Sequence, residues 1–276
     1  MKKILGFGLA VIFLTNSCSF KIPGSNVIRI KGSDTMLYLT QALADEYMKL
    51  NPGVSVYVEG GGTASGINSF TKGEIDICTA SRTLKPEEVK LIAEKFGSVG
   101  MATLIAKDAL SIFINPQNPV KNFTIDDVKK IFTGSITNWN MLGGDDADVI
   151  AIIRNPNSGT YLYFKEHILD GEEYSPSAVT EATTEKIISV IKENKYAIGY
   201  GGLAYGDKNL HARINGIEPT EENVINDKYP VTRYLHFYTL YQPDGVVKIF
   251  IDWVLSPAGQ SVVKKIGYIQ IYKREF

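Results

Sequence analysis

The sequence has little of the material from which several kinds of functional site are built. Only 2 cysteines and 3 histidines occur among its 276 residues. His167, His211 and His236 are scattered along the chain, whereas a zinc site needs clustered ligands. Basic residues number 29 and acidic residues 30, so the basic excess typical of a nucleic-acid-binding protein is missing. We therefore expect no metal site, no cofactor and no nucleic-acid partner.

Hydrophobic and aromatic residues, by contrast, are plentiful. Hydrophobic residues make up 44% of the chain, which includes 15 tyrosines and 12 phenylalanines. This composition is not that of a disordered chain, because it supplies ample material for packing. The length allows either one large core or two modest cores.

The N-terminal segment has the layout of a secretory signal peptide. Lys2 and Lys3 precede an apolar run, Ile4–Leu14, whose eleven residues are too few to span a bilayer comfortably. The segment that ends at Cys18 resembles a bacterial lipoprotein signal, in which the cysteine is acylated, although Thr15 stands where that pattern usually has leucine. We predict a signal peptide over residues 1–17, lipidation at Cys18 and a tether over residues 18–26. The alternative is an ordinary cleaved signal with a chance cysteine.

The second cysteine is expected to be structural. Cys78 lies in a strand-like segment, residues 74–80, and has no partner for a disulfide if Cys18 carries lipid. We predict a lone buried thiol that packs as a small hydrophobic group.

One local pattern recurs along the chain: a strand ends in a small polar turn that opens a helix. Strands are expected at 27–31, 54–59, 75–79 and 149–153, and each is followed by a turn rich in Gly, Ser or Thr. The pattern predicts an α/β sheet with helices packed on it. Further helices are expected at 86–96, 124–132, 187–193, 246–255 and 258–266, and further strands at 110–115, 197–200 and 234–241. We expect Ser33 or Asp34 to cap the first helix and Thr124 to cap the helix that it precedes.

Four of the turns carry groups suited to binding an anion, namely residues 33–35, 63–66, 81–82 and 158–160. A helix N-terminus presents free amide hydrogens and a partial positive charge. Arg82 and Arg154 add forked donors that match tetrahedral oxyanions. Each turn alone could be an ordinary helix cap, so the argument depends on their recurrence. The pattern predicts an anion-binding α/β protein and does not identify the anion.

Several segments together resemble a known family. The most specific are Arg154–Thr160 (RNPNSGT) and Phe132–Trp139 (FTGSITNW). Shorter matches are found at residues 32–36, 62–67, 198–200 and 255–260. Between about Val27 and Tyr268 these segments resemble, in the right order, motifs of the phosphate-binding proteins of Pst-type ABC importers.

The resemblance implies a two-lobed α/β periplasmic-binding-protein fold of type II, with the ligand between the lobes and two crossover strands. Lobe 1 would comprise residues 27–109 and 232–276, and lobe 2 residues 110–231. Carried over by position, the ligand contacts would be Thr35, the amide of Met36, Thr63, Ser65, Ser81, Arg82, Arg154, Ser158, Gly159 and Thr160.

The function that the resemblance implies is transport. The protein would be a monomeric lipoprotein at the outer side of the membrane that binds inorganic phosphate and delivers it to an ABC permease. Arg82 departs from the family pattern, because the best-known members have there an aspartate that accepts the proton of hydrogen phosphate. Rejection of sulfate would then need another carboxylate, for which Asp34 and Asp76 are candidates. Arg82 could instead form a lobe-to-lobe ion pair.

Two alternatives remain besides phosphate transport: a broader oxyanion receptor, and a surface adhesin or sensor on the same scaffold. An enzyme is not expected. Ser158 does not lie in the Gly-x-Ser-x-Gly turn of α/β-hydrolases. The glycine-rich turn 60–66 lacks the lysine of a P-loop.

Overall fold

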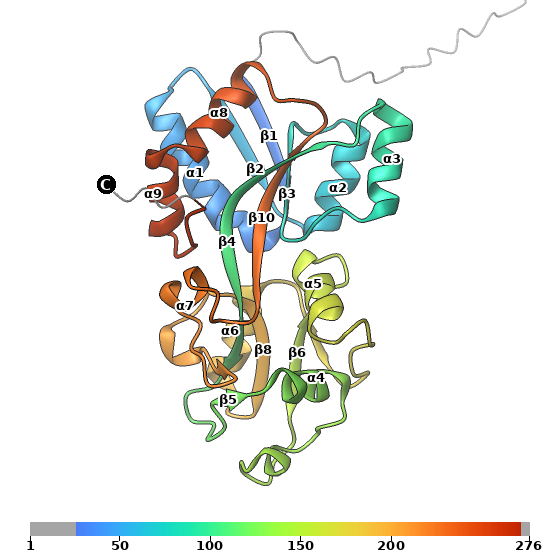
Figure 1. Ribbon diagram of the computed structural model, residues 1–276, viewed down its shortest axis with the longest axis vertical. Helices are drawn as coiled ribbons and strands as arrows, with labels where there is room; N and C mark the ends of the chain where they lie inside the picture. The colour runs from blue at the N-terminus through green and yellow to red at the C-terminus, as the bar shows by residue number, and fades with distance from the viewer. Residues whose placement is uncertain (1–25, 272–276) are drawn as a thin grey trace, which may run out of the picture.

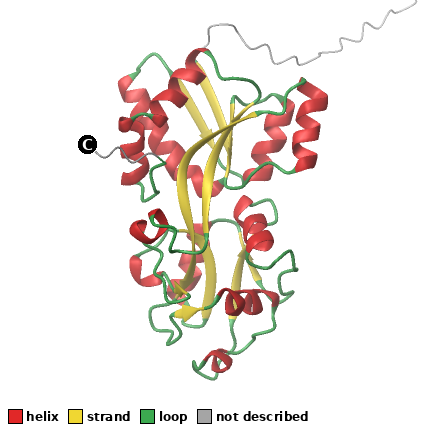
Figure 2. Cartoon of the chain, viewed as in Figure 1, coloured by secondary structure: helices red, strands yellow, loops and turns green. Residues whose placement is uncertain are grey.

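The computed structural model describes residues 26–271 and shows two α/β lobes connected by long strands (Figure 1). We call the lobe that contains the first strands lobe 1, and the other lobe 2. The predicted signal peptide, the lipidation site Cys18 and the tether up to residue 25 lie outside the described residues. Strands run through the middle of both lobes and helices flank them (Figure 2).

Lobe 1 is built on three parallel strands, in the order β2-β1-β3. Its elements are β1 (Val27–Gly32), the 3-10 turn η1 (Asp34–Met36), α1 (Leu37–Leu50), β2 (Ser55–Glu59), α2 (Thr63–Lys72), β3 (Ile77–Ala80), α3 (Pro86–Phe96), α8 (Gly245–Leu255) and α9 (Pro257–Lys265). Helices α1, α8 and α9 lie on one side of these strands, and α2 and α3 on the other (Figure 1). The apolar spacing of α1 buries Leu39, Leu43 and Tyr47, and the Tyr47 ring packs edge-on against Phe250 of α8.

Two long strands pass between the lobes. Strand β4 (Met101–Ile114) pairs antiparallel with β10 (Thr232–Thr239) along residues 101–109 and with β8 (Ala197–Gly202) through its last five residues. The sequence prediction for this strand, 110–115, was too short by nine residues at the N-terminal end. Lys107 and Asp108 interrupt the apolar pattern there, and Asp108 is buried only because it is paired with an arginine of β10.

Lobe 2 contains β5 (Asn122–Phe123), α4 (Ile125–Thr133), η2 (Trp139–Leu142), β6 (Ile150–Arg154), α5 (Gly159–His167), β7 (Val179–Glu181), α6 (Thr184–Glu193), β8, η3 (Lys208–Leu210), β9 (Arg213–Ile214) and α7 (Glu221–Ile225). Strands β8, β6 and β7 are parallel neighbours that extend the sheet of β4. Phe164 stacks on Tyr200 with ring centroids 4.0 Å apart, and Phe132 meets Phe164 edge-on at 4.9 Å. This aromatic cluster connects α4, α5 and β8.

The helix caps were predicted with mixed success. The Thr124 side chain accepts a hydrogen bond from the Asp127 amide and caps α4, as expected. Neither Ser33 nor Asp34 makes a side-chain cap bond to the first helix. Instead η1 precedes α1, and the Asp34 carboxylate binds groups elsewhere. Cys78 is a completely buried free thiol in β3, which confirms its predicted packing role.

Membrane-spanning helices and metal clusters are two further features that bear on function. Within residues 26–271 no single helix is long and apolar enough to cross a membrane. The successive helices α8 and α9 together have the necessary length and apolar composition, and the pair is bent by 65°. In the same range no cluster of three or more His, Cys, Asp or Glu side chains is arranged to hold a metal ion.

Candidate anion-binding site

The turns that follow β1, β3 and β6 meet between the lobes, together with the start of α2. The Thr35 hydroxyl of lobe 1 lies 2.8 Å from the Thr160 hydroxyl of lobe 2. Gly159, the first residue of α5, is close enough to lobe 1 that a Cβ atom there would lie 2.4 Å from Thr63 Oγ1 and 2.5 Å from Ser81 Oγ. Only glycine fits this approach. We call Thr35, Thr63, Ser81, Arg154, Gly159 and Thr160 the interlobe site.

Hydroxyl groups of lobe 1 line one side of the interlobe site. Thr63 and Ser81 are completely buried, and the Ser81 amide reaches Thr63 Oγ1 at a long 3.4 Å. Ser81 Oγ has no hydrogen-bond partner among the described residues. A buried hydroxyl without a partner is costly and therefore needs an explanation such as a ligand. Ser81 can donate to an anion held beside Gly159.

Arg154 supplies the buried positive charge of the site. It ends β6, is 1% exposed, and donates to Asp34 Oδ2 of lobe 1 at 3.0 Å. Its other donors bind the Ala182 carbonyl and the Thr184 hydroxyl, both at 3.2 Å. Burial lowers the pKa of the Arg154 guanidinium and the neighbouring Asp34 carboxylate opposes that shift, so it stays charged at neutral pH. The ion pair with Asp34 therefore spans the two lobes.

Of the two carboxylates that were candidates from the sequence, Asp34 reaches these groups, whereas Asp76 is held elsewhere. Asp34 Oδ1 accepts a 2.7 Å hydrogen bond from the Gly61 amide, while Oδ2 faces Arg154. Asp76 instead accepts from the Arg29 amide, in the middle of β1. Of the two acidic side chains considered from the sequence, only Asp34 contacts the interlobe site.

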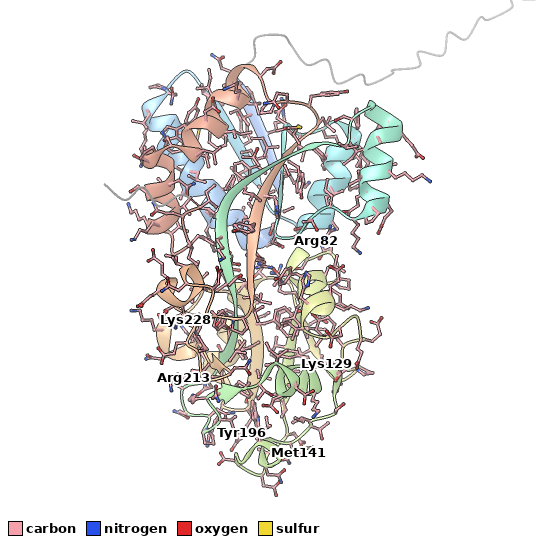
Figure 3. All side chains as sticks on the ribbon, in the orientation of Figure 1. Arg82, Lys129, Met141, Tyr196, Arg213 and Lys228 are labelled. Carbon is pink, nitrogen blue, oxygen red and sulfur yellow. The ribbon has the colours of Figure 1, made fainter. Side chains whose placement is uncertain are left out.

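Arg82 does not form the lobe-to-lobe ion pair considered as an alternative from the sequence. Its guanidinium forms a bidentate ion pair with Glu88 of α3, at 2.8 and 2.7 Å, and also binds the Thr83 carbonyl. Figure 3 shows Arg82 at the end of lobe 1 that faces lobe 2. The ion pair lies within lobe 1 and does not join the lobes. Burial raises the pKa of Glu88, but hydrogen bonds from Arg82 and the Lys85 amide outweigh burial and lower the pKa overall.

The remaining predicted residues divide into cap, core and half-buried positions. Ser158 Oγ accepts from the amides of Thr160 and Tyr161, so it caps α5 and has its proton left to donate. Met36 is completely buried, and its amide donates to the Ser33 carbonyl at 3.0 Å. Ser65 lies half-buried in the first turn of α2. The Met36 amide is thus already bonded within η1.

Sequence reasoning missed one buried ion pair that touches the site. Arg233 of β10 donates to Asp108 of β4 through Nε and Nη2, at 3.0 and 2.9 Å, and through Nη1 to Thr160 Oγ1 at 3.0 Å. Arg233 and Asp108 are partners in the strand register. The sequence signal that could have revealed this pair is one charge of each sign, Asp108 and Arg233, in otherwise apolar strands. Charges that are buried in a protein are usually paired.

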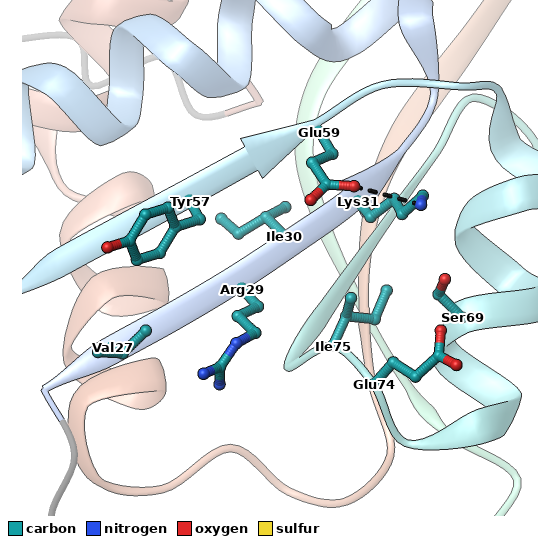
Figure 4. Close-up of a pocket in the computed structure, with 9 residues that line it drawn as sticks. All are labelled: Val27, Arg29, Ile30, Lys31, Tyr57, Glu59, Ser69, Glu74 and Ile75. Carbon is teal, nitrogen blue, oxygen red and sulfur yellow. Dashed lines mark ion pairs between the residues drawn. The ribbon is translucent and has the colours of Figure 1, made fainter. Parts of the chain in front are cut away.

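A pocket in lobe 1 is lined by none of the interlobe-site residues (Figure 4). It has a volume of about 550 Å³ and is lined by residues of β1 and β2 and by Glu74 and Ile75 before β3. Lys31 and Glu59 form an ion pair across part of it at 3.2 Å. Its charged groups are of both signs, which does not indicate an anion site.

Comparison with known proteins places this architecture in a class and then in a family. The PBP superfamily domain matches residues 21–258, which makes the chain a two-lobed binding protein of that class. The phosphate-binding protein PstS of Bacillus subtilis is 32% identical over 93% of this chain and 85% of its own. PstS of Pseudomonas aeruginosa strain PAO1 is also 32% identical, over 87% of this chain and 81% of its own.

Solved structures of similar proteins indicate the same family as these relatives. A Clostridium perfringens protein with bound phosphate, provisionally assigned as a phosphate ABC transporter substrate-binding protein, has a TM-score of 0.82, 33% identity, and coverage of 89% of this chain and 100% of its own. An ABC-type phosphate transport receptor from Vibrio cholerae has a TM-score of 0.73, 27% identity, and coverage of 88% and 99%. The chain belongs to the family of Pst-type phosphate-binding proteins. This confirms the resemblance and the fold class expected from the sequence.

Proposed function

We propose that this protein binds inorganic phosphate between its lobes and delivers it to the permease of an ABC importer. The observation that carries the proposal is the interlobe site itself, in which buried hydroxyl groups of both lobes surround the start of α5 beside a buried arginine. The proposed ligand groups are Thr35, Thr63, Ser65, Ser81, Arg82, Arg154, Ser158, Gly159 and Thr160. Arg82 Nε, like Ser81 Oγ, is buried without a hydrogen-bond partner among the described residues. Family membership supports the same ligand.

The chemistry of these groups suits a tetrahedral dianion. Hydroxyls and the free amides at the start of α5 donate hydrogen bonds without adding charge. Arg154 adds a charge-assisted donor that is already balanced by Asp34. The anion would bridge lobe 1 and lobe 2 and shift the population toward the closed form. We place the lobe boundaries at residues 109/110 and 231/232, which lie in β4 and just before β10.

Asp34 is proposed to select phosphate over sulfate in place of the aspartate that Arg82 replaces. Hydrogen phosphate keeps a proton that a carboxylate can accept, whereas sulfate at neutral pH has none. A carboxylate held beside sulfate would face oxygen lone pairs without a hydrogen bond, which is costly in a buried site. The contacts of Asp34 with the Gly61 amide and Arg154 hold its carboxylate at the edge of the site.

The test is a calorimetric titration of the full chain, purified in detergent and stripped of ligand, with phosphate and then with sulfate at pH 7. We expect tight phosphate binding and sulfate binding weaker by at least about 100-fold. Asp34→Asn should reduce this preference by about tenfold or more, equivalent to about 1.4 kcal/mol. Equal binding of both anions would indicate a broader oxyanion receptor. No heat with either would favour an adhesin or sensor.

The location follows from the N-terminal pattern. We propose that Cys18 carries a lipid that holds the protein at the outer side of the cytoplasmic membrane as a monomer, within reach of the permease. Metabolic labelling with a radioactive fatty acid should mark the wild-type chain and not Cys18→Ala, which should appear in the soluble fraction. Equal labelling of both would contradict lipidation at this residue.

Catalysis is not proposed, although one Ser–His contact exists. Ser111 Oγ lies 2.7 Å from His211 Nδ1. Ser111 is completely buried in β4, so no substrate could reach its hydroxyl. Burial also lowers the pKa of His211 to about 4. This pair is best explained as a hydrogen bond within lobe 2, and the relatives named above are binding and transport proteins.

A further inference from the structure

Arg233 contacts groups of both lobes and of both long strands. It lies on β10, is 4% exposed, and faces Asp108 on β4. These are the two strands that pass between the lobes. Nη1 of the same guanidinium reaches Thr160 Oγ1 of lobe 2 at 3.0 Å and, at a long 3.5 Å, the Ser81 carbonyl of lobe 1. One side chain therefore connects both crossing strands to both sides of the interlobe site.

The bond from Arg233 determines what the Thr160 hydroxyl can do. A threonine hydroxyl has one proton to donate and two lone pairs that accept, whereas a guanidinium only donates. Because Nη1 occupies a lone pair of Thr160 Oγ1, the Thr160 proton must point to another acceptor. The neighbouring acceptor is Thr35 Oγ1 at 2.8 Å, and an anion at the interlobe site would be a stronger one. A charged donor on the oxygen also polarises the O–H bond.

The position of Arg233 is held on several sides. Asp108 takes two of its donors and balances its charge. Tyr163 of α5 packs its ring against the guanidinium, 5.6 Å from the centroid, and its hydroxyl donates to the Thr232 carbonyl of β10 at 2.7 Å. Helix α5, whose first turn forms part of the interlobe site, is thus attached to β10 through both Thr160 and Tyr163. The orientation of Thr160 therefore depends on the position of β10.

We propose that Arg233, paired with Asp108, is a positioning residue for anion binding. It holds Thr160 as a hydrogen-bond donor to the anion and links the bound anion to the strands that cross between the lobes. The proposal rests on phosphate binding at the interlobe site, as proposed above. Arg233 acts through Thr160, and its own charge is balanced by Asp108.

A double-mutant cycle tests whether Arg233 affects anion binding through Thr160. Thr160→Val removes the hydroxyl and keeps the shape of the side chain. The neutral pair Asp108→Asn with Arg233→Gln removes both buried charges together, because Arg233→Gln alone would leave Asp108 unpaired and could unfold the protein. Phosphate affinity is measured by calorimetry on the full chain in detergent, and thermal unfolding confirms that each variant is folded. Arg213→Gln, at an exposed ion pair of β9 (Figure 3), is the matched control.

We expect Thr160→Val and the neutral pair each to weaken phosphate binding about tenfold or more, and the triple variant to be within about twofold of the weaker of the two, because both act on one hydrogen bond. Arg233→Lys, which keeps a charged donor, should recover part of the affinity that the neutral pair loses. Arg213→Gln should bind within about twofold of wild type.

The outcomes separate the two proposals. If the wild-type chain binds no phosphate, the proposed function fails and this inference fails with it. If wild type binds phosphate and the folded neutral pair binds within twofold of wild type, only the role of Arg233 is overturned. Losses that multiply in the triple variant would show that Arg233 does not act through Thr160, which also overturns the proposal.

Discussion

The ends of β3 and β6 carry the same kinds of residue and differ in what they connect. Each brings a serine and a buried arginine that binds a carboxylate to the end of a buried strand; Arg82 lies in the turn after β3, and Arg154 is the last residue of β6. The partner of Arg82 is Glu88, in the next helix of the same lobe. The partner of Arg154 is Asp34, in the opposite lobe. The first ion pair can persist in any arrangement of the lobes, whereas the second requires the lobes to be together.

This difference shows that the role of a buried arginine depends on where its carboxylate lies. A partner six residues away stabilises a local turn. A partner 120 residues away couples two bodies. The Arg154–Asp34 ion pair can then be coupled to closure of the lobes, whereas the Arg82–Glu88 ion pair forms within lobe 1. The predictions that follow test whether the two turns differ in this manner.

Arg154→Gln should have the largest effect. The substitution removes the charged donor at the interlobe site and leaves Asp34 without its partner across the lobes. We expect phosphate affinity to fall by about 2 kcal/mol or more, which is roughly 30-fold. Calorimetric titration measures the loss, and Arg154→Lys should retain part of the affinity. Near-normal binding by Arg154→Gln would remove this arginine from the site and end the contrast with Arg82.

Arg82→Gln should act mainly on stability. Its partner Glu88 is only 17% exposed, and a carboxylate left without its partner at such a site costs about 2 kcal/mol, less than for a fully buried pair. Urea denaturation should show this loss, and Glu88→Gln added to Arg82→Gln should recover part of it. Phosphate affinity should fall less than in Arg154→Gln. A loss as large as that of Arg154→Gln, at unchanged stability, would instead make Arg82 as important for binding as Arg154.

Gly159→Ala should weaken binding by keeping the two turns apart. The added methyl group would overlap Thr63 Oγ1 and Ser81 Oγ, and such overpacking costs about 1–2 kcal/mol. We expect phosphate affinity to fall while the unfolding of each lobe changes little. Small-angle scattering should show less compaction on adding phosphate than in wild type. Full compaction with normal affinity would mean that the lobes do not approach as closely in solution.

The sequence predicted the local features of this fold much better than the long-range ones. Helix α3 was predicted with its observed bounds, because Pro86 opens it and Gly97, in the left-handed conformation, ends it. The turns of the interlobe site were found because small polar residues between a strand and a helix are a local signal. The first nine residues of β4 were missed because the burial of Asp108 depends on Arg233, 125 residues away.

The difference between local signals and long-range pairing also applies to the interlobe site. The sequence singled out Arg82 and Arg154 equally, since both follow a strand. Which of them faces the other lobe depends on Glu88 and Asp34, and no local pattern reveals that choice. Arg233 gave no turn signal at all, because it lies within a strand and reaches Thr160 only through the pairing of β10 with β4. Side chains whose role depends on tertiary pairing needed the structure.

The pH dependence of stability is the smallest expected effect, and it tests the Arg82–Glu88 ion pair specifically. Hydrogen bonds from Arg82 lower the pKa of Glu88 below its ordinary value of about 4.5. The unfolded chain therefore takes up the proton more readily than the folded protein. The contribution of ionised Glu88 to the stability of the folded protein is therefore fully present above about pH 4.5. It is lost as the pH falls through the lowered pKa of Glu88. Wild type should thus exceed Glu88→Gln in stability most at neutral pH, with the difference shrinking below about pH 4.5.

Denaturation of both proteins between pH 7 and pH 3 measures this difference. The matched comparison uses Arg82→Gln with Glu88→Gln, which lacks both members of the pair and should lose the same part of the pH dependence as Glu88→Gln alone. A stability difference between wild type and Glu88→Gln that stays constant down to pH 3 would show that the Glu88 carboxylate gains nothing from Arg82. The ion pair would then not stabilise the β3 turn, and the contrast with the β6 turn would need another cause.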